Sequence, residues 1–174
     1  MSGIFSFPNP VNEKAARTVA AVVLGLSIAT LASGFYWLLV PLAYGFWARV
    51  LTGPTLSPLG WTAQKLVAPR LGERKPVAGP PKRFAQGMGA VMSTAALVFG
   101  LILGDHLVAD VLLGLLVIAS GLESIFAYCL GCRIFALLMR AGLVPAQVCA
   151  ECADISLRLR PGANGLATDQ SAGG

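Results

Sequence analysis

Charged residues are scarce in this chain. Only 12% of its 174 residues are Asp, Glu, Lys or Arg, whereas 56% are hydrophobic and the mean hydropathy is +0.73. A soluble domain of this length carries roughly a quarter charged residues, which keep its surface hydrated. The shortage excludes an ordinary soluble domain, and the long charge-free stretches indicate an integral membrane protein.

The N-terminal residues, MSGIFSFPNPVNEKAART, lack the pattern of a cleaved signal peptide. No basic stretch leads directly into an apolar core with a small-residue cleavage site, so we expect the first apolar segment to stay as an anchor. The net charge of +5 comes without any nucleic-acid-binding pattern. The expected counter-charge is therefore the anionic headgroups of a lipid bilayer, with no nucleic acid as partner.

Four apolar segments meet or approach the roughly 20 residues that a helix needs to cross a hydrocarbon core of about 30 Å. The first two form 37 residues of apolar sequence, too long for one crossing, and Ser33 and Gly34 lie in the middle where a turn is favoured. The last two flank a short polar turn, Gly104, Asp105 and His106. The expected spans are residues 15–32, 35–51, 84–104 and 107–130. We therefore predict an all-α fold, an integral membrane four-helix bundle of two tandem helical hairpins, with a short C-terminal interfacial helix.

The segments outside these spans complete the predicted layout. Six prolines between the hairpins exclude a continuous helix there, although residues 59–67 suit a short amphipathic helix at the membrane surface. The layout is a cytoplasmic N-terminal segment (1–14), a first transmembrane hairpin (15–51), a basic proline-rich cytoplasmic loop (52–83), a second hairpin (84–130), a cytoplasmic or interfacial segment with the second CxxC (131–160) and a disordered tail (161–174).

Basic residues are absent from the two short turns inside the hairpins. All 13 Lys and Arg residues fall on the other predicted side of the membrane. Because basic loops are retained in the cytoplasm during insertion, both termini and the central loop are expected inside the cell.

Four cysteines form two CxxC pairs, Cys129 with Cys132 and Cys149 with Cys152. One reading is thiol redox or sulfur transfer, in which one thiolate attacks and the second cysteine resolves the mixed disulfide; Arg133, next to Cys132, favours a thiolate. A second reading is a structural zinc or iron–sulfur site with all four cysteines as ligands, since their spacing suits such sites. A third is that the cysteines only fill apolar space.

Glu123 is the other candidate for chemistry. It lies about seven residues inside the cytoplasmic end of the fourth predicted span, where an unpaired carboxylate is costly. It can relay protons, or it can simply neutralise Arg17 or Arg49. The polar turn with Asp105, His106 and Asp110 is interpreted as a solvated turn with a helix-capping Asp rather than as a metal site.

Small residues recur in the second predicted hairpin. Gly100 and Gly104 have GxxxG spacing, and Gly114 and Gly121 lie one heptad apart. Such residues allow helices to approach closely, and we expect these contacts to be made within the bundle, with a dimer face as the alternative.

Four motifs carry a resemblance to a known family: VNEKAAR, GPTLSPLGW, GPPKRFAQ and LESIFAYCLGC. Over about residues 8–135 the chain resembles the bacterial membrane family catalogued as domain of unknown function 4395. The resemblance implies an inner-membrane protein, sometimes found with thioredoxin-like or sulfurtransferase-like proteins, and it supplies no reaction. The matching positions are Asn12, Glu13, Arg17, Gly53, Pro54, Pro58, Pro81, Arg83, Phe84, Glu123, Cys129, Gly131 and Cys132, whereas Cys149 and Cys152 lie outside the matched part.

Two hypotheses follow. The first is a membrane thiol-redox or sulfur-handling component with Cys129 and Cys132 as the reactive pair, Cys149 and Cys152 as a relay and Glu123 as a proton-coupled partner. The second is a non-catalytic accessory subunit that docks on a larger membrane complex or on anionic lipid.

Overall fold

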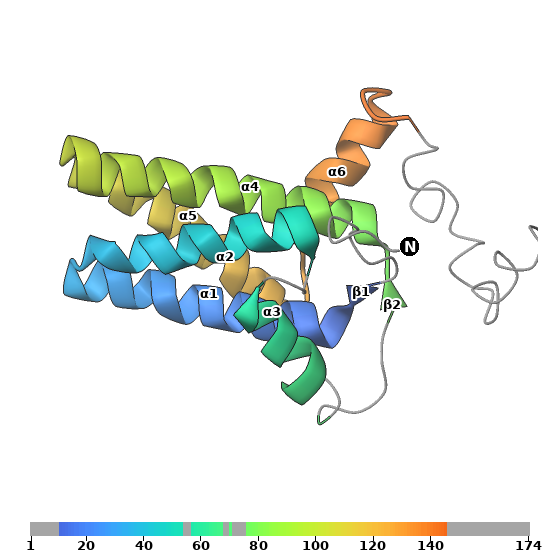
Figure 1. Ribbon diagram of the computed structural model, residues 1–174. Helices are drawn as coiled ribbons and strands as arrows, with labels where there is room; N and C mark the ends of the chain where they lie inside the picture. The colour runs from blue at the N-terminus through green and yellow to red at the C-terminus, as the bar shows by residue number, and fades with distance from the viewer. Residues whose placement is uncertain (1–10, 54–56, 68–69, 71–75, 146–174) are drawn as a thin grey trace, which may run out of the picture.

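The computed structural model describes residues 11–53, 57–67, 70 and 76–145, and nearly all of them are helical (Figure 1). Four helices, α1, α2, α4 and α5, run side by side, and α3, α6 and a small β ribbon lie at one end of them. The elements in chain order are β1 (Val11–Asn12), α1 (Glu13–Ser33), the 3-10 turn η1 (Tyr36–Leu38), α2 (Leu39–Thr52), α3 (Pro58–Thr62), the π-helical turn η2 (Ala63–Val67), β2 (Pro76–Val77), α4 (Gly79–Leu97), its π-helical continuation η4 (Val98–Leu103), α5 (His106–Phe126) and α6 (Leu130–Arg140).

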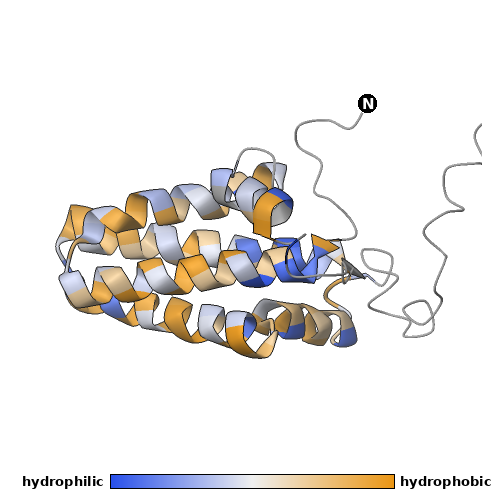
Figure 2. Ribbon diagram, turned by 90° about the horizontal axis from the view of Figure 1, so that it is seen from below, coloured by the Kyte–Doolittle hydropathy of each residue, from blue (hydrophilic) through white to orange (hydrophobic). Residues whose placement is uncertain are grey.

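Among the described residues, three helical segments are long and apolar enough to cross a membrane: Glu13–Ser33, Gly79–Leu103 and His106–Phe126. The helix expected as the second span is shorter, because η1 takes up its first turn and α2 itself has 14 residues. Figure 2 shows hydrophilic residues gathered near the end that carries the β ribbon, with apolar residues covering most of the remaining length. The described chain is thus an all-α protein with three candidate membrane spans.

Local sequence explains where the long helices begin and end. Asn12 caps α1, its side-chain oxygen accepting the Lys14 N–H at 3.1 Å. Gly34 ends α1 with a φ of 65°, a conformation that costs glycine little. At the opposite hairpin turn Asp105 accepts the Val108 N–H at 3.2 Å, which confirms the predicted capping aspartate.

The third long helix begins earlier than predicted. It was expected from residue 84, but α4 begins at Gly79, with proline in its first turn. Proline is tolerated there because the first N–H groups of a helix have no intrahelical partner and the proline φ is already helical. The end of the predicted loop is therefore part of α4, and this places Lys82 within the helix.

The fourth long helix ends earlier than predicted. It was expected to reach residue 130, but α5 stops at Phe126, where Ala127 adopts a left-handed conformation with a φ of 56°. The Ala127 N–H donates to the Leu122 carbonyl, and this hydrogen bond caps the C-terminal end of α5. The first CxxC pair consequently belongs to the start of α6 and not to the end of the fourth helix.

The helices pair across the two hairpins more than within them. α1 packs chiefly against α5, α2 packs chiefly against α4, and α4 also packs against α5. The core between them contains Val23, Leu39, Leu42, Ala90 and Leu113, all buried. Contact between α1 and α2 is slight. The chain connects the helices in the predicted order, but each helix of the first hairpin packs mainly on a helix of the second.

At the end of the molecule that carries the Gly34 and Gly104 turns, Tyr36 of the first hairpin contacts α5 of the second. Its hydroxyl donates to the Asp110 carboxylate at 2.8 Å, and its ring stacks on His106 with centroids 4.6 Å apart. A Cβ on Gly100 would lie 2.8 Å from the Tyr36 ring, so glycine is required there for close packing within the chain. Gly104 and Gly114 face open space instead.

At the other end, β1 and β2 pair antiparallel, with Val11 opposite Val77. This ribbon joins the start of α1 to the residues before α4, and it was not predicted, because two-residue strands leave no periodic signal. The helix expected within residues 59–67 is present as α3 and η2. The expected C-terminal helix is present as α6.

Candidate functional site

The corner between α5 and α6 brings the first CxxC pair against α4. Cys129 is the residue before the first turn of α6, Cys132 lies within that turn, and both are half-buried free thiols. Gly131 makes this packing possible, because a Cβ there would lie 2.5 Å from the Cβ of Ala85 and 2.7 Å from its Cα. The glycine of the CLGC motif thus sets how closely the thiols approach α4.

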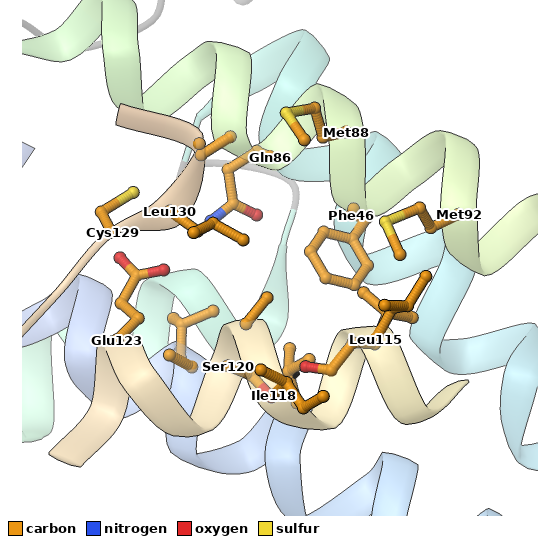
Figure 3. Close-up of a pocket in the computed structure, with 18 residues that line it drawn as sticks. Phe46, Gln86, Met88, Met92, Leu115, Ile118, Ser120, Glu123, Cys129 and Leu130 are labelled. Carbon is orange, nitrogen blue, oxygen red and sulfur yellow. Dashed lines mark hydrogen bonds between the residues drawn. The ribbon is translucent and has the colours of Figure 1, made fainter. Parts of the chain in front are cut away.

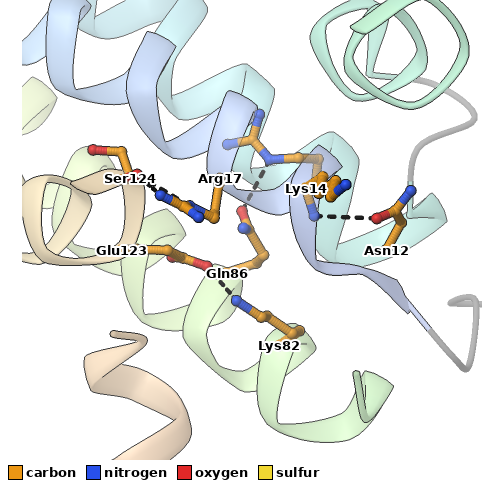
Figure 4. Close-up of polar contacts among 8 residues, drawn as sticks. Asn12, Lys14, Arg17, Lys82, Gln86, Glu123 and Ser124 are labelled. Atoms are coloured by element: carbon orange, nitrogen blue, oxygen red, sulfur yellow. Dashed lines mark hydrogen bonds and ion pairs between the residues drawn. The ribbon is translucent and has the colours of Figure 1, made fainter. Parts of the chain in front are cut away.

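A buried ion pair lies beside the thiols. Lys82 of α4 donates to the Glu123 carboxylate of α5, and their side chains are only 9% and 14% exposed (Figure 4). Glu123 lies three residues before the end of α5, closer to that end than predicted. Its ion-pair partner is Lys82, and not Arg17 or Arg49, the two partners that the sequence predicts.

Charge and hydrogen bonding make the two thiols unequal. A hydrogen bond from Cys132 lowers the pKa of Cys129 below its ordinary value, and the Lys82 ammonium acts in the same direction, while burial and the Glu123 carboxylate oppose them. The same hydrogen bond and burial raise the pKa of Cys132. Of the two thiols, Cys129 is therefore the one whose thiolate form is the more favoured.

Two arginines expected near Glu123 bond elsewhere. Arg17 donates to the Ser124 carbonyl at 3.0 and 3.1 Å and to the Ile125 carbonyl at 3.0 Å, where carbonyls at the end of α5 need donors (Figure 4). Arg49 is buried, lies over the Phe46 ring at 4.8 Å and donates from Nε to Gln86 Oε1 at 2.9 Å. Its two terminal nitrogens have no hydrogen-bond partner among the described residues.

The thiol corner opens onto an apolar pocket of about 280 Å³. Cys129 and Glu123 lie together at one end of it and Gln86 reaches in from α4, whereas Phe46, Met92 and Leu115 lie toward the other end (Figure 3). The pocket follows α5 from Leu115 to Glu123, a distance of about 12 Å by helical rise. Such a site suits a ligand with an apolar body and one hydrogen-bonding end.

The structure brings Cys129, Cys132 and Glu123 together, as the first hypothesis requires. Cys149 and Cys152 lie outside the described residues, so the four-cysteine metal site stays a prediction. Within the described ranges no group of three or more His, Cys, Asp or Glu residues is arranged to hold a metal ion.

The sequence did not predict that Lys82 pairs with Glu123 or that Gln86 accepts a hydrogen bond from Arg49. Two prolines directly before Lys82 suit the first turn of a helix, and this pattern could have placed Lys82 in the helix. Since Glu123 needs a cation inside the apolar layer, Lys82 was a candidate as soon as the helix was extended to include it.

Comparison with known proteins identifies a family. A family model described as Domain of unknown function (DUF4395) matches residues 11–140. No curated protein and no solved structure matches the chain. The matched part contains the Cys129–Cys132 pair, the ion pair and the pocket, and it ends before Cys149.

Proposed function

The chain belongs to the DUF4395 family, and from this premise we propose that it is an inner-membrane thiol–disulfide exchange component of a bacterium, with Cys129 and Cys132 as its reactive pair. The observation that carries the proposal is the placement of two inequivalent thiols beside the Lys82–Glu123 ion pair at one end of a pocket. A cysteine that only filled apolar space would need neither the cation nor the second thiol.

The proposed topology has four crossings, with both termini in the cytoplasm. Three helices have the length and hydropathy of spans, and η1 with α2 runs from Tyr36 to Thr52, about 25 Å by helical rise. That length fits a crossing in which aromatic residues sit at the outer interface. The absence of Lys and Arg from the Gly34 and Gly104 turns supports the orientation.

The proposed reaction is reversible exchange with a soluble partner. The Cys129 thiolate attacks a disulfide of the partner, an S–S bond forms between them, and one partner thiolate leaves. Cys132 then loses its proton and attacks the Cys129 sulfur, which closes the Cys129–Cys132 disulfide and releases the second partner thiolate. Two electrons pass to the partner; in reverse, a partner dithiol reduces the pair through the same mixed disulfide.

Lys82 and Glu123 have supporting roles in this proposal. The Lys82 ammonium stabilises the Cys129 thiolate electrostatically, and Glu123 holds the ammonium in place. Glu123 is also the proposed acceptor of the Cys132 proton, since among the described residues it is the carboxylate whose charge acts on both thiols. The partner class, a thioredoxin-like or sulfurtransferase-like protein, is proposed from the family resemblance.

The test is a trapping experiment on the full chain in lipid nanodiscs with oxidised glutathione. The Cys132→Ser variant should accumulate a glutathione adduct on Cys129, because the resolving thiol is missing. Wild-type protein should pass to the Cys129–Cys132 disulfide, and Cys129→Ser should give little adduct on Cys132. Peptide mass spectrometry identifies each product, and a persulfide donor in place of glutathione tests sulfur transfer. No adduct and no disulfide in any form would favour the non-catalytic accessory subunit instead.

A further inference from the structure

We propose that the pocket beside Cys129 binds a membrane-soluble quinone, which accepts the two electrons of the reduced Cys129–Cys132 pair. This inference rests on the proposed thiol exchange and names the second substrate of the same site. It follows from three features of the pocket: where it opens, how its polarity is divided, and which hydrogen-bond donor faces it.

The opening of the pocket lies on the apolar length of the helices. Leu115 and Ile118 of α5 both line the pocket and are 49% and 59% exposed, about midway along that helix. In the proposed topology this surface contacts lipid. A ligand that enters here comes from the bilayer and must therefore be soluble in it.

The pocket is divided into an apolar part and a reactive end. Met88, Met92, Phe46 and Leu115 surround the apolar part, and polarizable methionine side chains adapt to flat rings. The Cys129 thiol and the Glu123 carboxylate lie at the reactive end (Figure 3). A thiolate there repels an anionic headgroup, so an uncharged head is favoured over a fatty-acid carboxylate.

Gln86 supplies a hydrogen-bond donor of fixed orientation. Arginine has only donors, so the Gln86 amide must present its oxygen to Arg49 Nε, as the 2.9 Å bond records. Its amide nitrogen therefore faces away from Arg49. Because Gln86 reaches into the pocket (Figure 3), this nitrogen is placed to donate to a carbonyl oxygen.

An apolar ring with a carbonyl acceptor, able to oxidise a dithiol and soluble in lipid, is a quinone. In the proposed step the Cys129 thiolate and Cys132 form an S–S bond as the Cys132 S–H proton is lost, and a second proton comes from water at the cytoplasmic end. The two electrons and two protons reduce the ring carbonyls to hydroxyls, so a quinol leaves. A partner dithiol then reduces the disulfide again, and electrons move from the cytoplasm into the membrane.

The test uses decylubiquinone, a short-chain quinone, with reduced full-length protein in nanodiscs. Wild-type protein should form the Cys129–Cys132 disulfide and one equivalent of quinol. Ile118→Trp narrows the mouth of the pocket and should slow this oxidation about tenfold. Val111→Trp is the matched control, because Val111 is 58% exposed on the same helix and does not line the pocket; it should oxidise at nearly the wild-type rate.

Binding is measured separately from chemistry with a photoreactive azido-quinone. Labelling should fall on pocket peptides of α4 and α5, should persist in Cys132→Ser, and should be displaced by decylubiquinone but not by oleate. Equal displacement by oleate would identify an acyl-chain site and overturn the inference. Labelling without thiol oxidation, or oxidation unaffected by Ile118→Trp, would also overturn it. If glutathione trapping still succeeds in those cases, the proposed thiol exchange stands and only the quinone is rejected.

Discussion

Lys82 and Glu123 neutralise one another where both side chains are nearly shielded from solvent. We predict that Lys82→Met lowers stability by about 3–5 kcal/mol, because removing one partner leaves the other charge buried and unpaired. Glu123→Leu should cost a similar amount. The measurement is thermal unfolding of the purified protein in detergent, followed by the loss of helical circular dichroism.

The matched control is the double variant Lys82→Met with Glu123→Leu. It removes both charges, so it should recover most of the stability that either single variant loses. If the two single losses simply add, the pair is not coupled and the ion pair contributes little to holding α4 against α5.

Cys129 and Cys132 should differ in how alkylation depends on pH. Because the pKa of Cys129 is lowered and that of Cys132 is raised, Cys129 should react with iodoacetamide at pH values where an ordinary thiol, with a pKa of about 8.5, is mostly protonated. Its rate should rise with pH and level off above its own pKa, while Cys132 reacts only at higher pH. Peptide-resolved mass spectrometry measures both rates.

The Lys82→Met variant tests whether the Lys82 ammonium contributes to the lowered pKa of Cys129. Without the ammonium, the Cys129 profile should move to higher pH, since a neighbouring cation favours the thiolate. A Cys129 profile at or above that of an ordinary thiol in wild-type protein would contradict the assignment of Cys129 as nucleophile.

Gly131 fixes how α6 packs on α4. We predict that Gly131→Ala costs about 1–3 kcal/mol, because its Cβ would meet backbone and side-chain atoms of Ala85 that have no room to rotate away. The first turn of α6 must then move, and Cys129 should lose reactivity as it leaves Lys82. Thermal unfolding and the Cys129 alkylation rate are the two measurements.

Gly114→Ala is the control for Gly131→Ala. Gly114 also lies in a helix, but a Cβ there meets nothing within 4 Å. Alanine should be neutral or stabilising by up to about 1 kcal/mol, as its higher helix propensity requires. Equal losses of stability in the two variants would mean that close packing on Ala85 is not the reason why glycine is needed at position 131.

The long helices were largely predictable, because apolar length and glycine turns are visible in sequence. The turns at Gly34 and Gly104 fall where predicted, and the family suggested by the CLGC motif is confirmed. The errors lie at helix ends. The prolines before Lys82 indicate a loop from sequence, but they occupy the first turn of α4, and Ala127 ends α5 in a conformation that alanine seldom adopts.

Those two boundary errors account for much of what was missed at the site. A third helix predicted to start at residue 84 excludes Lys82, which leaves Arg17 and Arg49 as the candidate partners of Glu123. With α5 ending too late, Cys129 seemed to continue a membrane helix. The pocket was beyond prediction, because it depends on side chains of α1, α2, α4 and α5 that meet only in the folded chain.

The whole molecule has a proposed orientation that can be tested directly. Reporters fused at the Asp105 turn and after the C-terminus should lie on opposite sides of the membrane, since basic residues are confined to the end away from that turn. A reporter at the Gly34 turn should share the compartment of the Asp105 reporter. Finding the Asp105 and C-terminal reporters together would reject the four-crossing arrangement.

The pairing of α1 with α5 separates the order of synthesis from the order of assembly. Because α1 is synthesised before α5, it meets its principal neighbour only after α5 has entered the bilayer, and until then it contacts lipid or the insertion machinery. We therefore expect a truncated product that stops after α2 to lack the partners of both its helices and to be degraded. Two half-length polypeptides made in one cell, by contrast, should be stable only when they associate, because each half supplies the packing partners of the other.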